Sequence, residues 1–72
     1  MTEQLNKLDV VALLGEIPEK GLKRGQVGTI VEELGDEVYE VEFSDSQGRT
    51  YAQLALPSEK LLVLYYQPTK VA

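Results

Sequence analysis

The chain has 72 residues, which suits one domain and not two. It contains no histidine and no cysteine, which excludes disulfides, thiolate zinc sites, histidine general bases, and Cys–His or Ser–His nucleophilic pairs. The net charge is −5, and all seven charged residues between positions 32 and 45 are acidic.

The first fourteen residues permit two interpretations. Leu5, Leu8, Val11 and Ala12 have helical spacing. The compact apolar run with two adjacent valines, which ends at Gly15, instead indicates a strand. We favour a strand over residues 8–14 and keep the helix as the alternative.

Residues 15–25 then predict a long irregular loop. Gly21 and Gly25 supply the conformations with positive φ that a returning chain needs, and Pro18 fixes its own φ. We expect Ile17 and Leu22 to pack under this loop and to anchor it.

The middle of the chain predicts three strands. The β-forming residues of 26–34 indicate one strand, with a turn at Gly35 and Asp36. Residues 38–43 alternate, so that Tyr39, Val41 and Phe43 face the core. A loop over 44–48 then leads to a partner strand over 50–56.

The last part predicts a short 3₁₀ turn and a final strand. Pro57 to Lys60 indicates the turn, with Ser58 as its cap, and residues 61–66 form the strand. Tyr65 and Tyr66 are neighbours on it. Exposed tyrosines are candidates for contact with a partner; in the alternative interpretation, neighbours on a strand point to opposite faces, with one in the core and one on the surface.

These elements predict an all-β fold: a small five-stranded SH3-like barrel with a long first loop and a 3₁₀ turn before the last strand. Residues 1–72 form a single domain, with its core at about 8–66 and flexible ends at 1–7 and 67–72.

Carboxylates are the remaining side chains that could act as catalytic groups. Glu40 and Glu42 lie on one strand face, and Glu32 can stand across from them. Glycosidase chemistry needs two carboxyl groups about 5–9.5 Å apart in a cleft that raises one pKa, and a small barrel has little depth for one. Ser58 and Lys60 are too close along a turn for proton transfer. We therefore predict no catalytic residue, no metal ligand, no cofactor and no enzymatic activity.

Residues 23–31, with the sequence KRGQVGTIV, resemble a KOW-type element, the glycine-flanked strand of small barrels in ribosomal and transcription proteins. That resemblance implies binding to RNA or protein. The strands that follow are acidic, whereas phosphate backbones require positive charge. Protein is therefore favoured over nucleic acid.

A second resemblance covers most of the chain. The stretches LDVVAL (8–13), GLKRGQVGTIVE (21–32), YEVEF (39–43) and GRTYA (48–52) resemble the family called domain of unknown function 4926. This resemblance implies a small SH3-like barrel from a bacterium, and it assigns no catalytic residue.

We expect a non-catalytic protein–protein interaction module that is a monomer or a weak homo-oligomer. Neutralisation of a basic partner enzyme, as inhibitors and antitoxins do, an accessory subunit of an enzyme, and an RNA-binding barrel are the alternatives. Met1 to Gln4 are polar and acidic where a signal peptide is basic, which predicts a cytoplasmic protein without membrane contact. The candidate partner-binding residues are Glu32, Glu33, Glu40, Glu42, Asp45, Arg49, Tyr51, Lys23 and Arg24.

Overall fold

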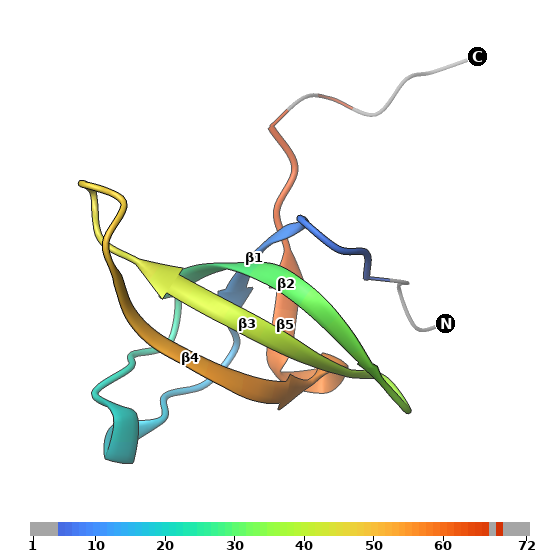
Figure 1. Cartoon of the computed structure of the whole chain (residues 1–72), viewed down its shortest axis with the longest axis horizontal. Helices are drawn as coiled ribbons and strands as arrows, with labels where there is room; N and C mark the ends of the chain where they lie inside the picture. The colour runs from blue at the N-terminus through green and yellow to red at the C-terminus, as the bar shows by residue number, and fades with distance from the viewer. Residues whose placement is uncertain (1–4, 67, 69–72) are drawn as a thin grey trace.

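A computed structural model describes residues 5–66 and 68 and shows one antiparallel sheet of five strands in the order β4-β3-β2-β1-β5 (Figure 1). The strands are β1 (Val10–Leu13), β2 (Val27–Gly35), β3 (Val38–Ser44), β4 (Thr50–Pro57) and β5 (Leu61–Val63). Two short 3₁₀ helices, η1 (Pro18–Lys20) and η2 (Ser58–Lys60), precede β2 and β5. The described residues contain no helix that is long and apolar enough to cross a membrane.

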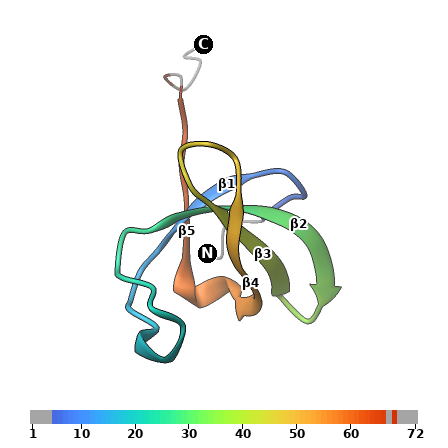
Figure 2. The same ribbon diagram turned by 60° about the vertical axis from the view of Figure 1, so that its left-hand side comes forward.

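The sheet curls because β2 is bent. Its register against β3 shifts between Ile30 and Glu32 and again between Glu33 and Gly35, and each shift places an extra residue on β2. Such bulges bend a strand and increase its twist. The curl brings β5 behind β3 and β4, as the two views show (Figures 1 and 2).

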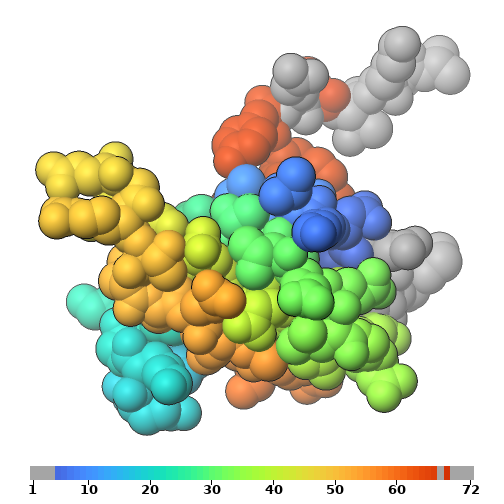
Figure 3. Space-filling model, in the orientation of Figure 1, coloured from blue at the N-terminus to red at the C-terminus, as the bar shows by residue number. Residues whose placement is uncertain are grey.

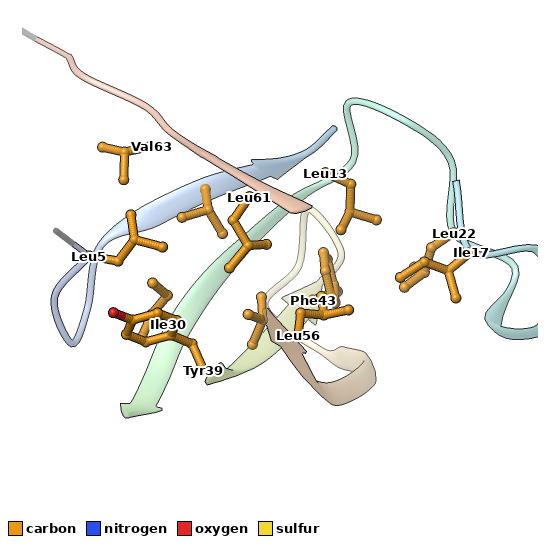
Figure 4. Packing of buried hydrophobic residues seen from close by; sticks show 12 residues of the cluster. Leu5, Leu13, Ile17, Leu22, Ile30, Tyr39, Phe43, Leu56, Leu61 and Val63 are labelled. Carbon is orange, nitrogen blue, oxygen red and sulfur yellow. The ribbon is translucent and has the colours of Figure 1, made fainter. Parts of the chain in front are cut away.

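The core fills the space inside this curl (Figure 4). The inward face of β3 supplies Tyr39, Val41 and Phe43, whose exposed fractions are 4%, 0% and 0%. The predicted alternation of β3 is therefore confirmed. Other core residues come from the segment before β1, from the other strands and from the first loop: Leu5, Val11, Leu13, Ile17, Leu22, Ile30, Leu56, Leu61 and Val63.

The all-β class, the five strands and the 3₁₀ turn before the last strand are confirmed. The barrel is not closed, since the order of the sheet leaves β4 and β5 as its two edges. The chain passes from one edge to the other through η2 without pairing them.

The first loop is anchored as predicted. Ile17 and Leu22 exchange two backbone hydrogen bonds around η1, and both side chains are buried. Gly21 ends η1 in the left-handed conformation, with φ of 69°. The long loop is thus a small ordered hairpin fixed to the core.

Several predicted boundaries differ from the structure. Residues 5–14 contain no helix, and β1 covers only Val10–Leu13. Leu5, placed in the N-terminal end by the sequence analysis, is buried in the core. The last strand stops at Val63, so Tyr65 and Tyr66 both lie beyond it and are both exposed. The rest of the predicted ends, residues 1–4, 67 and 69–72, lies outside the described part of the chain.

Candidate functional site

Three carboxylates share the outer face of the sheet. Because Tyr39, Val41 and Phe43 point into the core, the alternate residues Glu40 and Glu42 of β3 point outward. The first bulge of β2 places Glu32 opposite Glu40. We call Glu32, Glu40 and Glu42 the acidic face.

The acidic face has little neutralising charge around it. In the described part of the chain, none of its three carboxylates forms an ion pair. From Val27 to Pro57 the sheet carries seven acidic residues and one cation, Arg49. The Glu40 carboxylate instead accepts a hydrogen bond of 3.1 Å from Nε2 of Gln53 on β4. The Glu40 side chain is therefore directed toward β4, and its negative charge is not neutralised by this hydrogen bond, because the glutamine amide is uncharged.

Glu33 is separated from the acidic face. Its cross-strand partner is Tyr39, whose side chain points into the core. Paired residues lie on the same side of a sheet, so Glu33 belongs to the opposite side, at the open end of β2, where it is exposed. The bulge that brings Glu32 opposite Glu40 causes this separation.

Asp45 and Arg49 make their polar contacts within the loop between β3 and β4. Oδ1 of Asp45 accepts the backbone amides of Gln47 and Arg49, both at 2.9 Å. Its Oδ2 lies 3.4 Å from Nε of Arg49, and Nη2 of Arg49 donates to Gln47 at 2.7 Å. The amide of Arg49, and then that of Gln47, hold the pKa of Asp45 below its ordinary value of 3.8. This loop projects beyond the sheet (Figure 3).

Tyr51, Lys23 and Arg24 lie where the first loop meets the start of β4. The hydroxyl of Tyr51 accepts a hydrogen bond of 2.8 Å from Nε2 of Gln26. Oε1 of Gln26 in turn accepts the backbone amide of Lys23, at 2.8 Å. The side chains of Lys23 and Arg24 are exposed. These three residues form a group apart from the acidic face.

Ser58 does not cap η2. The cap position belongs to Pro57, and no side chain caps this helix. Ser58 instead donates from Oγ to the Glu37 carboxylate at 3.1 Å, and its backbone amide donates to the Glu37 carbonyl at 2.8 Å. Its role is to fix the end of β4 to the turn between β2 and β3.

The open edge of β4 is a candidate surface that is not among the residues predicted from the sequence. β4 pairs only with β3, and its residues 50–57 have no other backbone hydrogen bond within the described part of the chain. Its sequence, TYAQLALP, carries no charge. The absence of charged residues over 50–57 is visible in the sequence, but it indicates an exposed binding edge only if β4 is known to be an edge strand.

A shallow apolar depression of about 350 Å³ lies beside β1. It is lined by Leu8, Asp9, Val10, Leu64, Tyr65 and Tyr66. Leu8, Tyr65 and Tyr66 are the most exposed large apolar residues among those described, at 72%, 71% and 81%. Its lining comes from residues 8–10 and 64–66, next to β1 and β5, and includes no residue of the acidic face.

A model of the family described as domain of unknown function DUF4926 matches residues 7–63. No curated protein and no solved structure matched the chain. Among the described residues, no group of three or more Asp or Glu side chains is arranged to hold a metal ion.

Proposed function

The chain belongs to the DUF4926 family, and we propose that it is a non-catalytic protein-interaction domain whose partner is a basic protein. The acidic face is its binding surface. Neutralisation of a basic enzyme is one form that this function takes, in a bacterial and cytoplasmic setting as the sequence predicts.

The observation that supports the proposal is the pairing of Glu32 with Glu40. Like charges directly opposite each other on neighbouring strands destabilise a sheet. Glu42, two residues along β3, adds to the same negative potential. A cationic surface laid on this face relieves the repulsion and gains favourable contacts, and the negative field accelerates its approach.

The surrounding residues support a protein partner over catalysis by the chain alone. Glu32 is exposed, and Glu40 and Glu42 are half-buried on an open sheet face. Catalytic carboxylates usually need an enclosed site in which burial shifts the pKa. A flat charged face is better suited to binding the surface of a second macromolecule than to enclosing a small substrate.

The test compares two triple variants with the same net charge. E32Q/E40Q/E42Q removes the acidic face, and E16Q/E19Q/E59Q removes three exposed carboxylates elsewhere. Each variant changes the net charge from −5 to −2, since three negative charges are removed. All three proteins are immobilised and exposed to an extract of the source cells at low salt.

We expect the original chain and the E16Q/E19Q/E59Q variant to retain the same basic protein, and the acidic-face variant to lose it. The retained protein should elute as salt rises, because the screening length falls from about 30 Å at 0.01 M to about 3 Å at 1 M. Equal retention by both variants, or partners that are neutral or acidic, would contradict the proposal.

A further inference from the structure

The longer free edge of the sheet is β4, and between the bulge at its start and the proline at its end no residue blocks a further strand. Edge strands are usually protected by lysines, prolines, bulges or a short length. β4 has eight residues, against three in β5, and no charged side chain. A register shift against β3 places an extra residue on β4 between Thr50 and Ala52, so the regular part of this edge begins at Ala52. Its proline, Pro57, stands at the very end.

The direction of the backbone groups follows from the ladder with β3. Ser58 donates its amide to the Glu37 carbonyl, so residues 37 and 58 form a hydrogen-bonded pair. Hydrogen-bonded and non-hydrogen-bonded pairs alternate along an antiparallel ladder. Leu56 and Leu54, which pair with Tyr39 and Val41, are therefore bonded to β3.

Ala55 lies between Leu54 and Leu56, and Gln53 precedes Leu54, so both belong to pairs that are not hydrogen-bonded to β3. Their backbone N–H and C=O groups accordingly point away from β3, to the open edge. Pro57 occupies the next position of the same kind, where its missing N–H costs no ladder bond. The side chains of Gln53 and Ala55 lie on the outer face, since they pair with Glu42 and Glu40.

We propose that the basic partner of the acidic face binds as an extended segment, which adds to β4 as an antiparallel sixth strand. This inference rests on the proposed function and specifies its mode. In this arrangement, the two residues of the partner segment that lie opposite Gln53 and Ala55 are lysine or arginine. The residues that alternate with them along the segment are apolar.

The charge of the neighbouring strand selects a cationic occupant. The partner residue opposite Ala55 projects its side chain on the outer face of the sheet. Glu40 is paired with Ala55 from the other side, so the partner residue and Glu40 are two strand spacings, or about 10 Å, apart. Ala55 is small enough for a long side chain to pass over it. The Glu40 carboxylate already leans toward β4, as its hydrogen bond to Gln53 shows. A lysine or arginine there meets an unneutralised carboxylate.

The inner face of the edge favours apolar residues at the alternate positions. Ala52 and Leu54 are only partly buried, although both pack against the core. An apolar side chain opposite Leu54 covers the surface that they leave exposed, which is favourable in proportion to the area removed from water. The proposed segment thus alternates between cationic and apolar residues.

A second copy of the chain suits this edge less well. Its β4 would bring no cation, because TYAQLALP is uncharged and the strands behind it are acidic. The acidic faces of both copies would then lie on one continuous sheet. The free protein is therefore expected to leave the edge unpaired.

The test uses three synthetic peptides of alternating lysine and valine, each eight residues long, which is enough to cover the regular part of β4. One is unmodified, one carries N-methyl groups on the lysine amides, and one carries them on the valine amides. All three have the same charge. In antiparallel addition the lysine amides face β4 and the valine amides face solvent. No change to the protein is needed, so misfolding cannot affect the comparison.

We expect the peptide methylated on lysine to bind about ten-fold more weakly than the unmodified one, because it loses several backbone hydrogen bonds. The peptide methylated on valine should keep its affinity. On binding, the amides of Gln53 and Ala55 should become protected from hydrogen exchange, whereas that of Leu54 is already bonded. Equal affinity of all three peptides, or no binding of the unmodified one, would overturn the inference.

The same peptides separate this inference from the proposed function. If E32Q/E40Q/E42Q weakens binding but methylation has no effect, the acidic face binds cations without strand addition, and only the inference fails. If methylation matters but this variant binds normally, the proposed function fails. Protection of the Gln53 and Ala55 amides in the free protein that disappears on dilution would show a dimer through β4 and would also overturn the inference.

Discussion

Gly28 of β2 lies directly against two core side chains of β3. A Cβ atom built on Gly28 would lie 2.8 Å from Cγ1 of Val41 and 2.9 Å from two ring atoms of Phe43. Both side chains have an exposed fraction of 0%, and such tightly packed groups cannot move without disturbing the core. The glycine is required by this contact and not by its φ.

We expect Gly28→Ala to lower the free energy of unfolding by about 1–3 kcal/mol, the usual cost of overpacking a core. Gly15→Ala is the matched control, because no atom lies within 4 Å of its Cβ position. It should change stability by no more than about 0.5 kcal/mol. Urea unfolding measures both, and equal effects of the two substitutions would show that the contact is absent.

Asp45 should make the β3–β4 loop sensitive to acid. Its folded pKa lies below 3.8 because the backbone amides of Arg49 and Gln47 stabilise the carboxylate. A depressed folded pKa contributes stability that is present above the unfolded value and is lost as the pH falls through the folded value. The loop contacts should therefore be intact above pH 3.8 and should weaken as the pH falls below it.

An NMR titration of the Asp45 carboxyl group and of the Gln47 and Arg49 amides measures this directly. We expect a common midpoint below 3.8. In Asp45→Asn the two amides retain an oxygen acceptor, but their titration in this range should disappear. A midpoint at or above 3.8 would contradict the role assigned to the loop amides.

At the scale of elements, the turn between β2 and β3 carries backbone strain. The sequence predicts a turn at Gly35 and Asp36, but Gly35 is the last residue of β2 and the two loop residues are Asp36 and Glu37. Their φ values are 53° and 59°. A two-residue loop with positive φ at both positions matches the twist of the hairpin, and it is unfavourable for Glu37.

Glu37→Gly should stabilise the protein by about 0.5–1 kcal/mol, because glycine adopts positive φ without the steric cost. The substitution also removes the exposed hydrogen bond from Ser58 Oγ, and Ser58→Ala measures that loss separately. Thermal unfolding compares the variants. Both variants lose this hydrogen bond, so a melting temperature for Glu37→Gly no higher than that of Ser58→Ala would mean that glycine relieves no strain at this position.

For the whole molecule, the uneven charge predicts that salt stabilises the fold. Net charge far from zero destabilises a compact state through repulsion, and here the repulsion is concentrated in the sheet of β2, β3 and β4. The free energy of unfolding in urea should therefore rise as sodium chloride increases from about 0.01 M to about 1 M.

Glu32→Gln should raise stability at low salt by about 0.2–1 kcal/mol, since it removes the like charge opposite Glu40. Its response to salt should be correspondingly smaller. Glu59→Gln, which changes the net charge equally at an exposed position on η2, should respond to salt much as the original chain does. An identical salt response in Glu32→Gln and Glu59→Gln would locate the repulsion outside the acidic face.

The sequence by itself determined the all-β class, the inward side of β3 and the anchoring of the first loop. These depend on local properties, namely alternation, turn residues and the frequent glycines and prolines that follow residue 14. It also placed Glu40 and Glu42 on one face, because two residues on the same strand need no knowledge of pairing.

Only the tertiary structure decided which residues meet across strands. The bulge of β2 brings Glu32 to Glu40 and sends Glu33 to the opposite side, and a register shift of one residue has no local signature. The open edge of β4 exists because the curled sheet leaves it unpaired with β5, and pairing between distant strands is a property of the assembled sheet.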